Sequence, residues 1–341
     1  MTKHTAAFLI ALILVSSSLL GEKLAVLPEV NNANMMDISS SELYIMDNEQ
    51  IKVYSMKDYT LLRKLGKRGE GPGELLTLPD APFTMTVHEK KVILNSVYKA
   101  IIYDKSGKMI KEVKFAPFWL VEANPIGKNY AATKTKWIDR TLHACTWILD
   151  PGMKEIKKIY ETDLPTSYKK KKSPIPLLCT FARCTGERIF LFDQQKDTIK
   201  VFDPQGNPLP DIKFPYEPII TTDAFREKVN YAIKTHPVYK HLPPELMKRF
   251  YTPDVLPVFR ECRVIGDRLY IQTYRQKGDL SEFLFIDFSG KLIKKLFLPG
   301  TDRLQLRLNP ASTYDFQNGR YYYLVEDLDE EQWELHVMNV D

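Results

Sequence analysis

The sequence predicts an all-β protein, a six-bladed β-propeller of four-stranded blades with a helical insertion between blades 4 and 5. The main observation is a repeated segment, in which an apolar alternating run ends at an Asp-led turn and then restarts. One such unit cannot bury its own apolar face, so its repetition at a spacing of tens of residues indicates a radial or solenoid array. The copies lie at 100–107, 199–206 and 284–290, with looser copies at 147–152 and 51–58.

The order of strands within one unit is clearest in the fourth unit. Its four strands are expected at 176–182, 186–193, 198–202 and 208–214, with the Asp203 turn between the last two. Six four-stranded meanders of this kind have the content of a six-bladed propeller. Counterparts of the second strand recur at 41–47, 90–94, 127–130, 266–271 and 318–324.

The two ends of the predicted propeller complete each other. The sixth unit matches the others only through its third strand and reaches Asp341 at the point where the other units turn into a fourth. A strand-like run at 23–30 precedes the first unit. If this run pairs with the last blade, it closes the ring and covers two sheet edges that would otherwise be open to aggregation.

Residues 1–21 are expected to be a cleaved export signal, and residues 22–341 to be the propeller. Lys3 and His4 precede an apolar stretch that is followed by small residues at 16–21. The apolar segment has about 15 residues, fewer than the roughly 20 that a membrane-spanning helix needs. A cleaved signal is therefore favoured over an uncleaved anchor. The mature protein is expected to have no membrane span and to be periplasmic or extracellular.

The composition agrees with one large globular body. The chain is 44% hydrophobic and 27% charged, which is typical of folded proteins. Its net charge of +5 is too small to indicate nucleic-acid binding. The four cysteines are too few to form a disulfide scaffold in a chain of this length, so buried thiols are favoured. We expect a monomer.

A glycine-rich segment, Leu65 to Leu75, reads Leu-Gly-Lys-Arg-Gly-Glu-Gly-Pro-Gly-Glu-Leu. It resembles the start of NHL repeats, above all those of the NHL-like six-bladed propellers among exported bacterial proteins. Its glycines would let the chain reverse through positive φ between an outer strand and the next inner strand. A phosphate-binding role is not favoured, because no helix follows and the Gly-Lys-Ser/Thr ending is missing.

The helical insertion, expected at 217–256, breaks the β pattern between the fourth and fifth units. Thr222 and Asp223 would cap a helix at 224–234, and a second short helix is expected at 243–251. The first helix has one apolar face, as expected for a helix that lies on a surface. This face contains Phe225, Val229 and Ala232.

Three connections that leave an outer strand and enter the next inner strand are rich in Lys and Arg, and in a propeller they emerge on one face. Such a face would attract an anionic partner, although charge runs are also ordinary solvated surface. Export argues against a nucleic acid and favours an envelope or extracellular protein, a peptide or an acidic glycan. The candidate binding residues are Lys67, Arg68, Glu74, Lys169, Lys170, Lys171, Lys172, Arg226, Lys248 and Arg249.

The sequence predicts no catalytic residues, no metal ligands and no cofactor. The six histidines lack metal-ligand spacing, and there is no Gly-x-Ser-x-Gly motif. Related propellers include lactonases and lyases that hold an axial divalent metal, but the expected inner strands at 83–87, 176–182 and 258–264 offer only Glu261. The leading prediction is a non-catalytic binding or scaffold propeller outside the cytoplasm. The alternative is a metal-dependent lactonase-like or lyase-like propeller enzyme.

Overall fold

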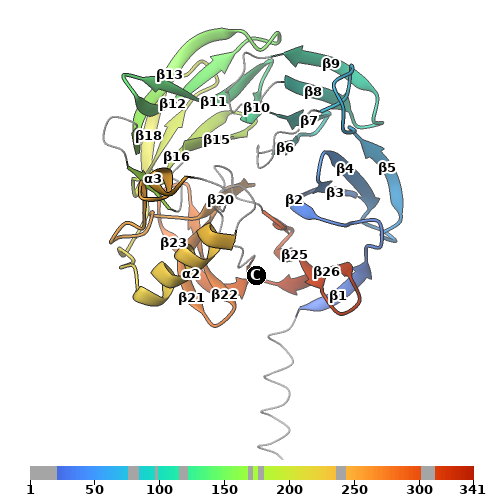
Figure 1. The fold of residues 1–341 in the computed structure, drawn as a ribbon. Helices are drawn as coiled ribbons and strands as arrows, with labels where there is room; N and C mark the ends of the chain where they lie inside the picture. Colours follow the sequence, from blue (N-terminus) through green and yellow to red (C-terminus); the bar gives the residue numbers. More distant parts are fainter. Residues whose placement is uncertain are drawn as a thin grey trace, which may run out of the picture.

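A computed structural model describes residues 21–75, 84–96, 99–114, 122–167, 172–175, 180–235, 243–300 and 312–341. Six antiparallel sheets of four strands surround a central axis (Figure 1), which confirms the six-bladed propeller. Most of the predicted export signal lies outside the described residues. Among the described residues, no helix is long and apolar enough to cross a membrane.

In the first three blades, the strands follow one another outward from the axis in chain order. Blade 1 contains β2 (Ala33–Ser39), β3 (Glu42–Asp47), β4 (Gln50–Ser55) and β5 (Leu61–Leu65). Blade 2 contains β6 (Thr84–Val87), β7 (Lys91–Asn95), β8 (Lys99–Asp104) and β9 (Met109–Lys114). Blade 3 contains β10 (Glu122–Ile126), β11 (Asn129–Ile138), β12 (Thr141–Leu149) and β13 (Glu155–Ser167).

Blades 4 and 5 keep this order, whereas blade 6 takes its outer strand from the start of the propeller. Blade 4 contains β15 (Thr180–Thr185), β16 (Arg188–Asp193), β17 (Thr198–Phe202) and β18 (Pro208–Lys213). Blade 5 contains β20 (Glu261–Ile265), β21 (Arg268–Lys277), β22 (Leu280–Asp287) and β23 (Leu292–Pro299). Blade 6 contains β24 (Tyr314–Gln317), β25 (Arg320–Asp327), β26 (Gln332–Asn339) and β1 (Glu22–Val26).

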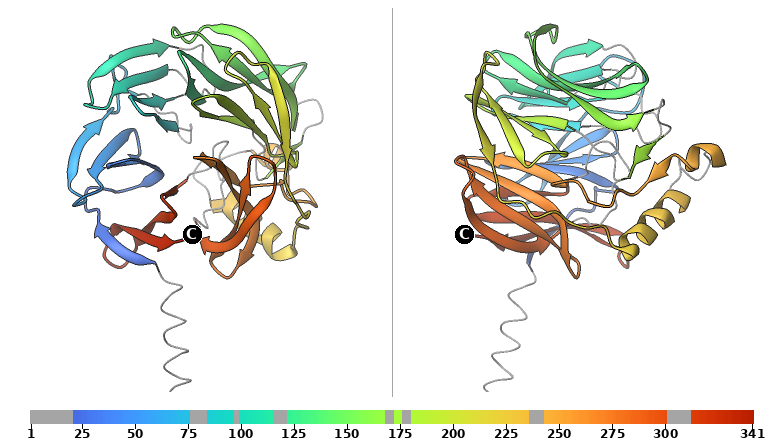
Figure 2. Two further views of the ribbon diagram at one scale, coloured as in Figure 1. Left: turned by 180° about the vertical axis from the view of Figure 1, so that it is seen from behind. Right: turned by 90° about the vertical axis from the view of Figure 1, so that its left-hand side faces the viewer.

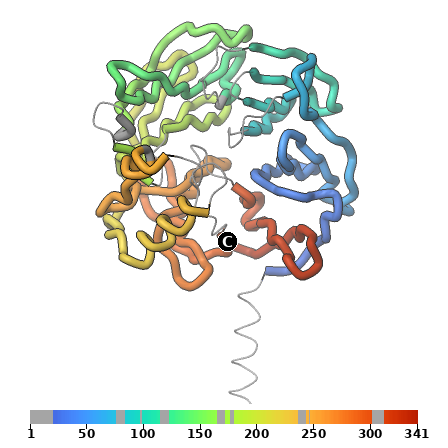
Figure 3. Tube along the Cα trace, viewed as in Figure 1, coloured from blue at the N-terminus to red at the C-terminus, as the bar shows by residue number. Residues whose placement is uncertain are grey.

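The pairing of β1 with β26 closes the ring, as predicted. The two strands run antiparallel, from the pair Glu22 and Val337 to the pair Val26 and Glu334. The amide of Leu27 continues the pairing by donating to the Trp333 carbonyl at 2.7 Å. Figure 3 shows the blue start of the propeller beside its red end. The strand is shorter than the expected 23–30, because the amide of Val30 turns back to the carbonyl of Leu27.

The Asp-led turns of the repeat share one hydrogen-bonding pattern. In each turn, the Asp Oδ1 accepts from the backbone amide four residues later, at 2.8 to 3.0 Å. An aspartate that bonds its own turn in this way fixes the reversal between the third and fourth strands. The repeated Asp therefore has a structural role. The four turns begin at Asp104, Asp150, Asp203 and Asp287.

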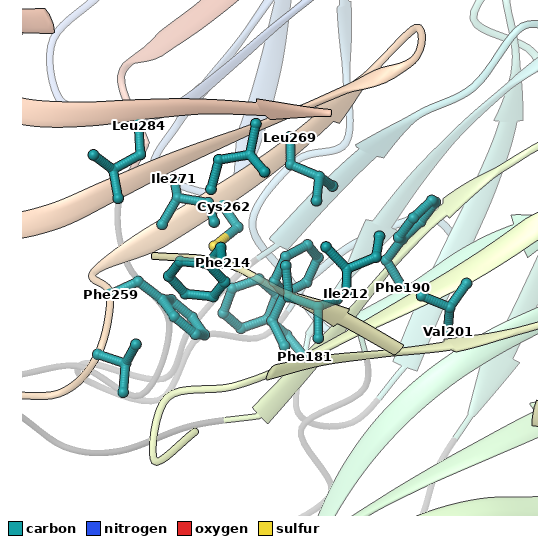
Figure 4. Close-up of a cluster of buried hydrophobic side chains, with 14 residues drawn as sticks. Phe181, Phe190, Val201, Ile212, Phe214, Phe259, Cys262, Leu269, Ile271 and Leu284 are labelled. Carbon is teal, nitrogen blue, oxygen red and sulfur yellow. The ribbon is translucent and has the colours of Figure 1, made fainter. Parts of the chain in front are cut away.

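The core consists of apolar clusters, the largest of which lies between blades 4 and 5 (Figure 4). In it, the Phe181 ring stacks on the Phe192 ring at 5.4 Å between centroids, and Phe259 meets both rings edge-on. Cys262 is fully buried in the same cluster, and Cys145 is buried in blade 3. The predicted burial of thiols is confirmed for these two residues. Cys184 is only partly buried and lines the axial cavity, and Cys179 lies outside the described residues.

The helical insertion lies between blades 4 and 5, as predicted, and contains α2 (Asp223–Thr235) and α3 (Pro244–Met247). Thr222 caps α2, since the amide of Phe225 donates to its Oγ1 at 3.2 Å. The second helix was expected to reach residue 251 and ends earlier. Its last expected residues instead form β19 (Phe250–Tyr251), which pairs in parallel with β14 (Ser173–Pro174).

This pairing joins the insertion to the connection between blades 3 and 4. Val229 and Ile233 of α2 are buried against Ile175, which follows β14. Figure 2 shows the helices on the side of the ring opposite the C-terminus. We call this side the insertion face. The opposite side is the hairpin face, because the amide of Val340 donates to the carbonyl of Gly319 and so places the C-terminus beside the turn between β24 and β25.

Replacing Leu27 by alanine should destabilise the whole ring, because this residue is fully buried where the closing segment meets blade 6. Loss of a buried leucine side chain costs about 2–5 kcal/mol. Val26→Ala is the matched control, since Val26 is 38% exposed and its truncation should cost about 1 kcal/mol or less. Urea denaturation measures both variants, and equal losses would contradict a closing role for this segment.

Candidate functional site

The innermost strands of the six blades surround a cavity of about 350 Å³ on the axis. This volume lies within the range of about 300–1,000 Å³ found for small-molecule sites. The lining residues come from the last part of each inner strand and from the adjoining turns, for example Gly266 and Gln317. The cavity is therefore near the hairpin face, away from the insertion.

Each blade contributes one polar side chain to the cavity from the same strand position. Every inner strand turns into the second strand through two residues, and the polar residue stands third before that turn. In blade 2 the two turn residues are Glu89 and Lys90, because the backbones of His88 and Lys91 bond to each other just beyond β6. A two-residue turn fixes which residues pair in a hairpin. Because all six residues stand at the same distance from their turn, they lie at the same depth along the axis. We call this set the axial ring. In blade order it contains Asp37, Thr86, Asn124, Arg183, Arg263 and Asp315.

Arg263 holds three blades together at the axis. Its Nη2 donates to the Met36 carbonyl of blade 1 at 3.1 Å. The same nitrogen donates to Ser312 Oγ, just before blade 6, at 2.8 Å, and to the Tyr314 carbonyl, in blade 6, at 3.3 Å. The Arg263 side chain is only 10% exposed. Its Nε lies 3.4 Å from Glu261 Oε1, so the buried cation has a buried counter-charge.

The acidic side of the ring consists of Asp37 and Asp315, on neighbouring blades. Asp315 accepts from the amides of Ile38 at 2.7 Å and Phe316 at 2.8 Å, while burial raises its pKa. Burial also raises the pKa of Asp37 from 3.8 to about 8, and the Asp315 carboxyl adds to this effect. Arg263, Lys105 and Arg183 oppose the increase. Burial and the neighbouring carboxyl thus favour the protonated form of Asp37.

The basic side consists of Arg183, on blade 4. Arg263, on blade 5, extends toward the acidic side, and its Nη1 pairs with Asp37 Oδ2 at 3.8 Å. The Arg183 guanidinium lies 4.7 Å from the centroid of the Phe181 ring, and its Nη1 donates to the Ala182 carbonyl at 3.1 Å. Blade 4 is opposite blade 1 in the ring of six (Figure 1), so Arg183 and Asp37 belong to opposite blades.

The third side of the ring, from blades 2 and 3, carries no charged ring residue. Asn124 Nδ2 donates to the Ala182 carbonyl at 3.1 Å. Thr86 Oγ1 is buried and, within the described part of the chain, has no hydrogen-bond partner. His88 also lines the cavity, and burial lowers its pKa. These groups offer a ligand neutral donors and acceptors.

The glycine-rich segment forms a turn that bonds to itself and to blade 2. Glu74 pairs with Lys67 at 2.6 Å and accepts from the Gly71 amide at 3.0 Å. The Gly73 amide, at a φ of 71°, donates to Glu112 Oε2 at 2.8 Å. Its polar groups therefore serve the blade-to-blade connection, and the phosphate-binding role has no support here.

The other predicted binding residues gather partly on the insertion. Arg226 pairs with Asp254 at 2.7 Å, and Lys248 pairs with Glu245 at 2.9 Å. The carbonyl of Arg249 accepts from the Ser173 amide, and Lys172 Nζ lies 5.9 Å from the centroid of the Tyr251 ring. An anionic partner on this face stays a prediction. Lys67, Arg68 and Glu74 belong to the connection between blades 1 and 2, and Lys169, Lys170 and Lys171 lie outside the described residues.

Sequence analysis missed the axial ring and named only Glu261 on the inner strands. Glu261 begins β20 and is 2% exposed beside Arg263. The sequence contains one signal for the axial ring, a polar residue three positions before the two-residue turn that ends each inner strand. Among the described residues, no group of three or more His, Cys, Asp or Glu side chains is placed to hold a metal ion.

Comparisons with known proteins support the fold. No family model and no curated protein matches the sequence. A structure of a member of the DUF4221 family from Bacteroides vulgatus is 10% identical, covers 94% of this chain and 98% of its own, and has a TM-score of 0.51. An identity this low shows a shared propeller fold and nothing finer.

Two further solved structures are more distant. A protein of unknown function from Bacteroides caccae is 8% identical over 84% of this chain and 82% of its own, with a TM-score of 0.41. The β-propeller domain of Cps50 (Swd1) from Myceliophteria thermophila is 14% identical over 93% of this chain and 99% of its own, with a TM-score of 0.45.

Asp37→Asn should change how stability depends on pH. Because the pKa of Asp37 is higher in the folded state (about 8) than its ordinary value of 3.8, the folded protein keeps a proton that the unfolded chain releases in this window. The contribution of Asp37 to stability therefore falls as pH rises from about 4 to about 8. At pH 8 the variant should be more stable by at least about 1 kcal/mol, the equivalent of one unit of pKa.

Urea denaturation at pH 5, 6.5 and 8 measures this effect. The matched control is Asp267→Asn, at a side chain that is 92% exposed in the turn after β20. This control should follow the parent protein at every pH. A gain in the Asp37 variant that is the same at pH 5 and pH 8 would count against a proton on Asp37.

Proposed function

We propose that this protein is an exported, NHL-like β-propeller that acts as a non-catalytic binding module and holds a small polar solute in its axial cavity. The observation that carries the proposal is the axial ring, in which six blades present polar side chains at one depth around a cavity of ligand size. Burying charged groups costs free energy unless they are paired. Thr86 Oγ1 and the Asp37 carboxyl, which line the cavity without a hydrogen bond among the described residues, therefore favour a ligand.

The ring is held in place before any ligand binds, as a binding site requires. The hydrogen bonds of Arg263 to neighbouring blades and those of backbone amides to Asp315 fix both groups from outside the cavity. Such preorganisation lowers the cost of ordering the site during binding. A protein, peptide or acidic glycan on the insertion face is compatible with this role, because that face is separate from the cavity.

Two observations support export and the NHL-like assignment. β1 begins at Glu22, directly after the apolar segment, so cleavage near residue 21 would leave the closing strand intact. The glycine-rich turn, from Leu65 to Leu75, connects an outer strand to the next blade, which is the place that the resemblance implies.

The mature chain should begin near Glu22 and be recovered outside the cytoplasm. N-terminal sequencing of protein from the periplasm or medium tests this expectation. Soluble cytoplasmic protein that retains Met1 would contradict it.

A solute that enters the axial cavity should raise the melting temperature, because ligand present at 100 times its Kd stabilises the folded state by about 2.7 kcal/mol. Differential scanning fluorimetry of purified protein against amino acids, sugars, nucleosides, carboxylates and inorganic phosphate measures this shift. We expect Gln317→Trp, which narrows the cavity, to abolish the shift.

The matched control is Lys90→Trp, which adds the same side chain at an exposed turn on the same face without lining the cavity. It should bind like the parent protein. The proposal fails if no solute shifts the melting temperature, or if Gln317→Trp binds as well as the control.

A further inference from the structure

We infer that the axial cavity binds a small zwitterion, a solute of amino-acid or dipeptide size that carries both an ammonium group and a carboxylate. This inference rests on the proposed function of the cavity as a binding site. It follows from where the charges of the axial ring stand and from what each charged group already contacts.

Charges of opposite sign lie across the axis from each other. Asp37 and Asp315 stand on the neighbouring blades 1 and 6, whereas Arg183 stands on blade 4, opposite blade 1. Arg263, from blade 5, reaches toward blade 1, and its Nη1 lies 3.8 Å from Asp37 Oδ2. A solute with one charge can complement only one of these sides. A solute with opposite charges at its two ends complements both, and the separation also fixes its orientation.

Asp37 is the group that would meet the ammonium. Its side chain is 23% exposed, and the hydrogen bonds of the described residues include none to its carboxyl. Its Oδ2 lies 3.8 Å from Arg263 Nη1, which is beyond hydrogen-bond distance. By contrast, both oxygens of Asp315 already accept from backbone amides. Asp37 is thus the acidic group still able to accept from a ligand.

Arg183 is the group that would meet the carboxylate. Its guanidinium is fixed by the Phe181 ring and by the hydrogen bond to the Ala182 carbonyl. A planar guanidinium held in one orientation recognises a carboxylate with good geometry. Arg263 is less suited, because it stands beside the acidic side, with its Nη1 3.8 Å from Asp37 Oδ2.

The uncharged side of the ring offers a further contact. Thr86 Oγ1 is buried and lacks a hydrogen-bond partner among the described residues, which is costly unless something supplies one. It lines the same cavity between the acidic and basic sides. A polar atom in the middle of the solute, such as a peptide N–H, would bond to it.

Titration calorimetry with the twenty common amino acids and glycylglycine tests the inference. The best binder is then compared with its N-acetyl derivative, which lacks the ammonium, and its amide, which lacks the carboxylate. We expect the zwitterion to bind at least about tenfold more tightly than either derivative, the effect of losing one charged hydrogen bond.

Variants assign each end of the solute to its residue. Asp37→Asn should weaken the zwitterion at least about tenfold and remove the preference over the N-acetyl derivative, and Arg183→Met should do the same for the amide. The matched controls are Asp267→Asn, in an exposed turn of the hairpin face, and Arg320→Met, at the exposed start of β25, and both should bind normally. Unchanged binding by both ring variants would overturn the inference.

Proton release gives a second readout of the contact with Asp37. The groups facing Asp37 are Asp315, Arg263, Lys105 and Arg183, and together with burial they leave its pKa at about 8. An ammonium beside Asp37 favours the ionised carboxylate, so binding at pH 7 should release about one proton, and affinity should rise as pH rises from 6 to 8. Calorimetry in two buffers of different ionisation enthalpy measures the release. The release should disappear in Asp37→Asn, and an equal release by that variant contradicts contact with Asp37.

The outcomes also separate this inference from the proposed function. If no amino acid and no glycylglycine binds while another solute raises the melting temperature, the zwitterion is wrong and the binding function stands. If no solute of any class binds, both are wrong.

Discussion

The antiparallel pairing of β1 with β26 is the interaction on which the axial site depends. It holds blade 6 in the ring, so that blades 1, 5 and 6 meet at the axis. The hydrogen bonds of Arg263 then join residues 227 and 49 positions apart in the chain, and the bond from Ile38 to Asp315 spans 277 positions. None of these contacts is local. The acidic and basic sides face each other only when the ring is closed.

Two repeated positions of the blade show different constraints. The Asp that begins the third turn is the same residue in four blades and makes the same hydrogen bond in each. The axial ring position is also polar in every blade, but its residue type changes from acid to neutral to base around the axis. A position that served only the fold would not need this variety. The variation points to recognition of a ligand that lacks sixfold symmetry.

The sequence predicted the architecture because apolar alternation and Asp-led turns are local signals. The closing strand and the insertion were predicted because the repeat is incomplete in the sixth unit and is interrupted between the fourth and fifth units. The axial ring was missed because it arises from six strands distant in the chain and from small errors in strand bounds. The inner strand of blade 4, expected at 176–182, is Thr180–Thr185, and only this shift brings Arg183 into the strand. Likewise, β19 replaced the end of the second helix because Phe250 pairs with Ser173, a contact that no local pattern shows.

A proton on Asp37, which burial favours, would also explain how the ring tolerates its own charges. Arg263 is balanced by Glu261 at 3.4 Å, and the Asp315 carboxyl is bonded by two amides. A second ionised carboxylate next to Asp315 would be repelled and poorly solvated, and a proton removes this cost. A ligand ammonium can take the place of that proton, because it brings the same unit of positive charge. Asp37 with its proton and ionised Asp37 beside an ammonium have the same total charge of zero. The ligand ammonium also gains the Asp37 carboxylate as a hydrogen-bond acceptor.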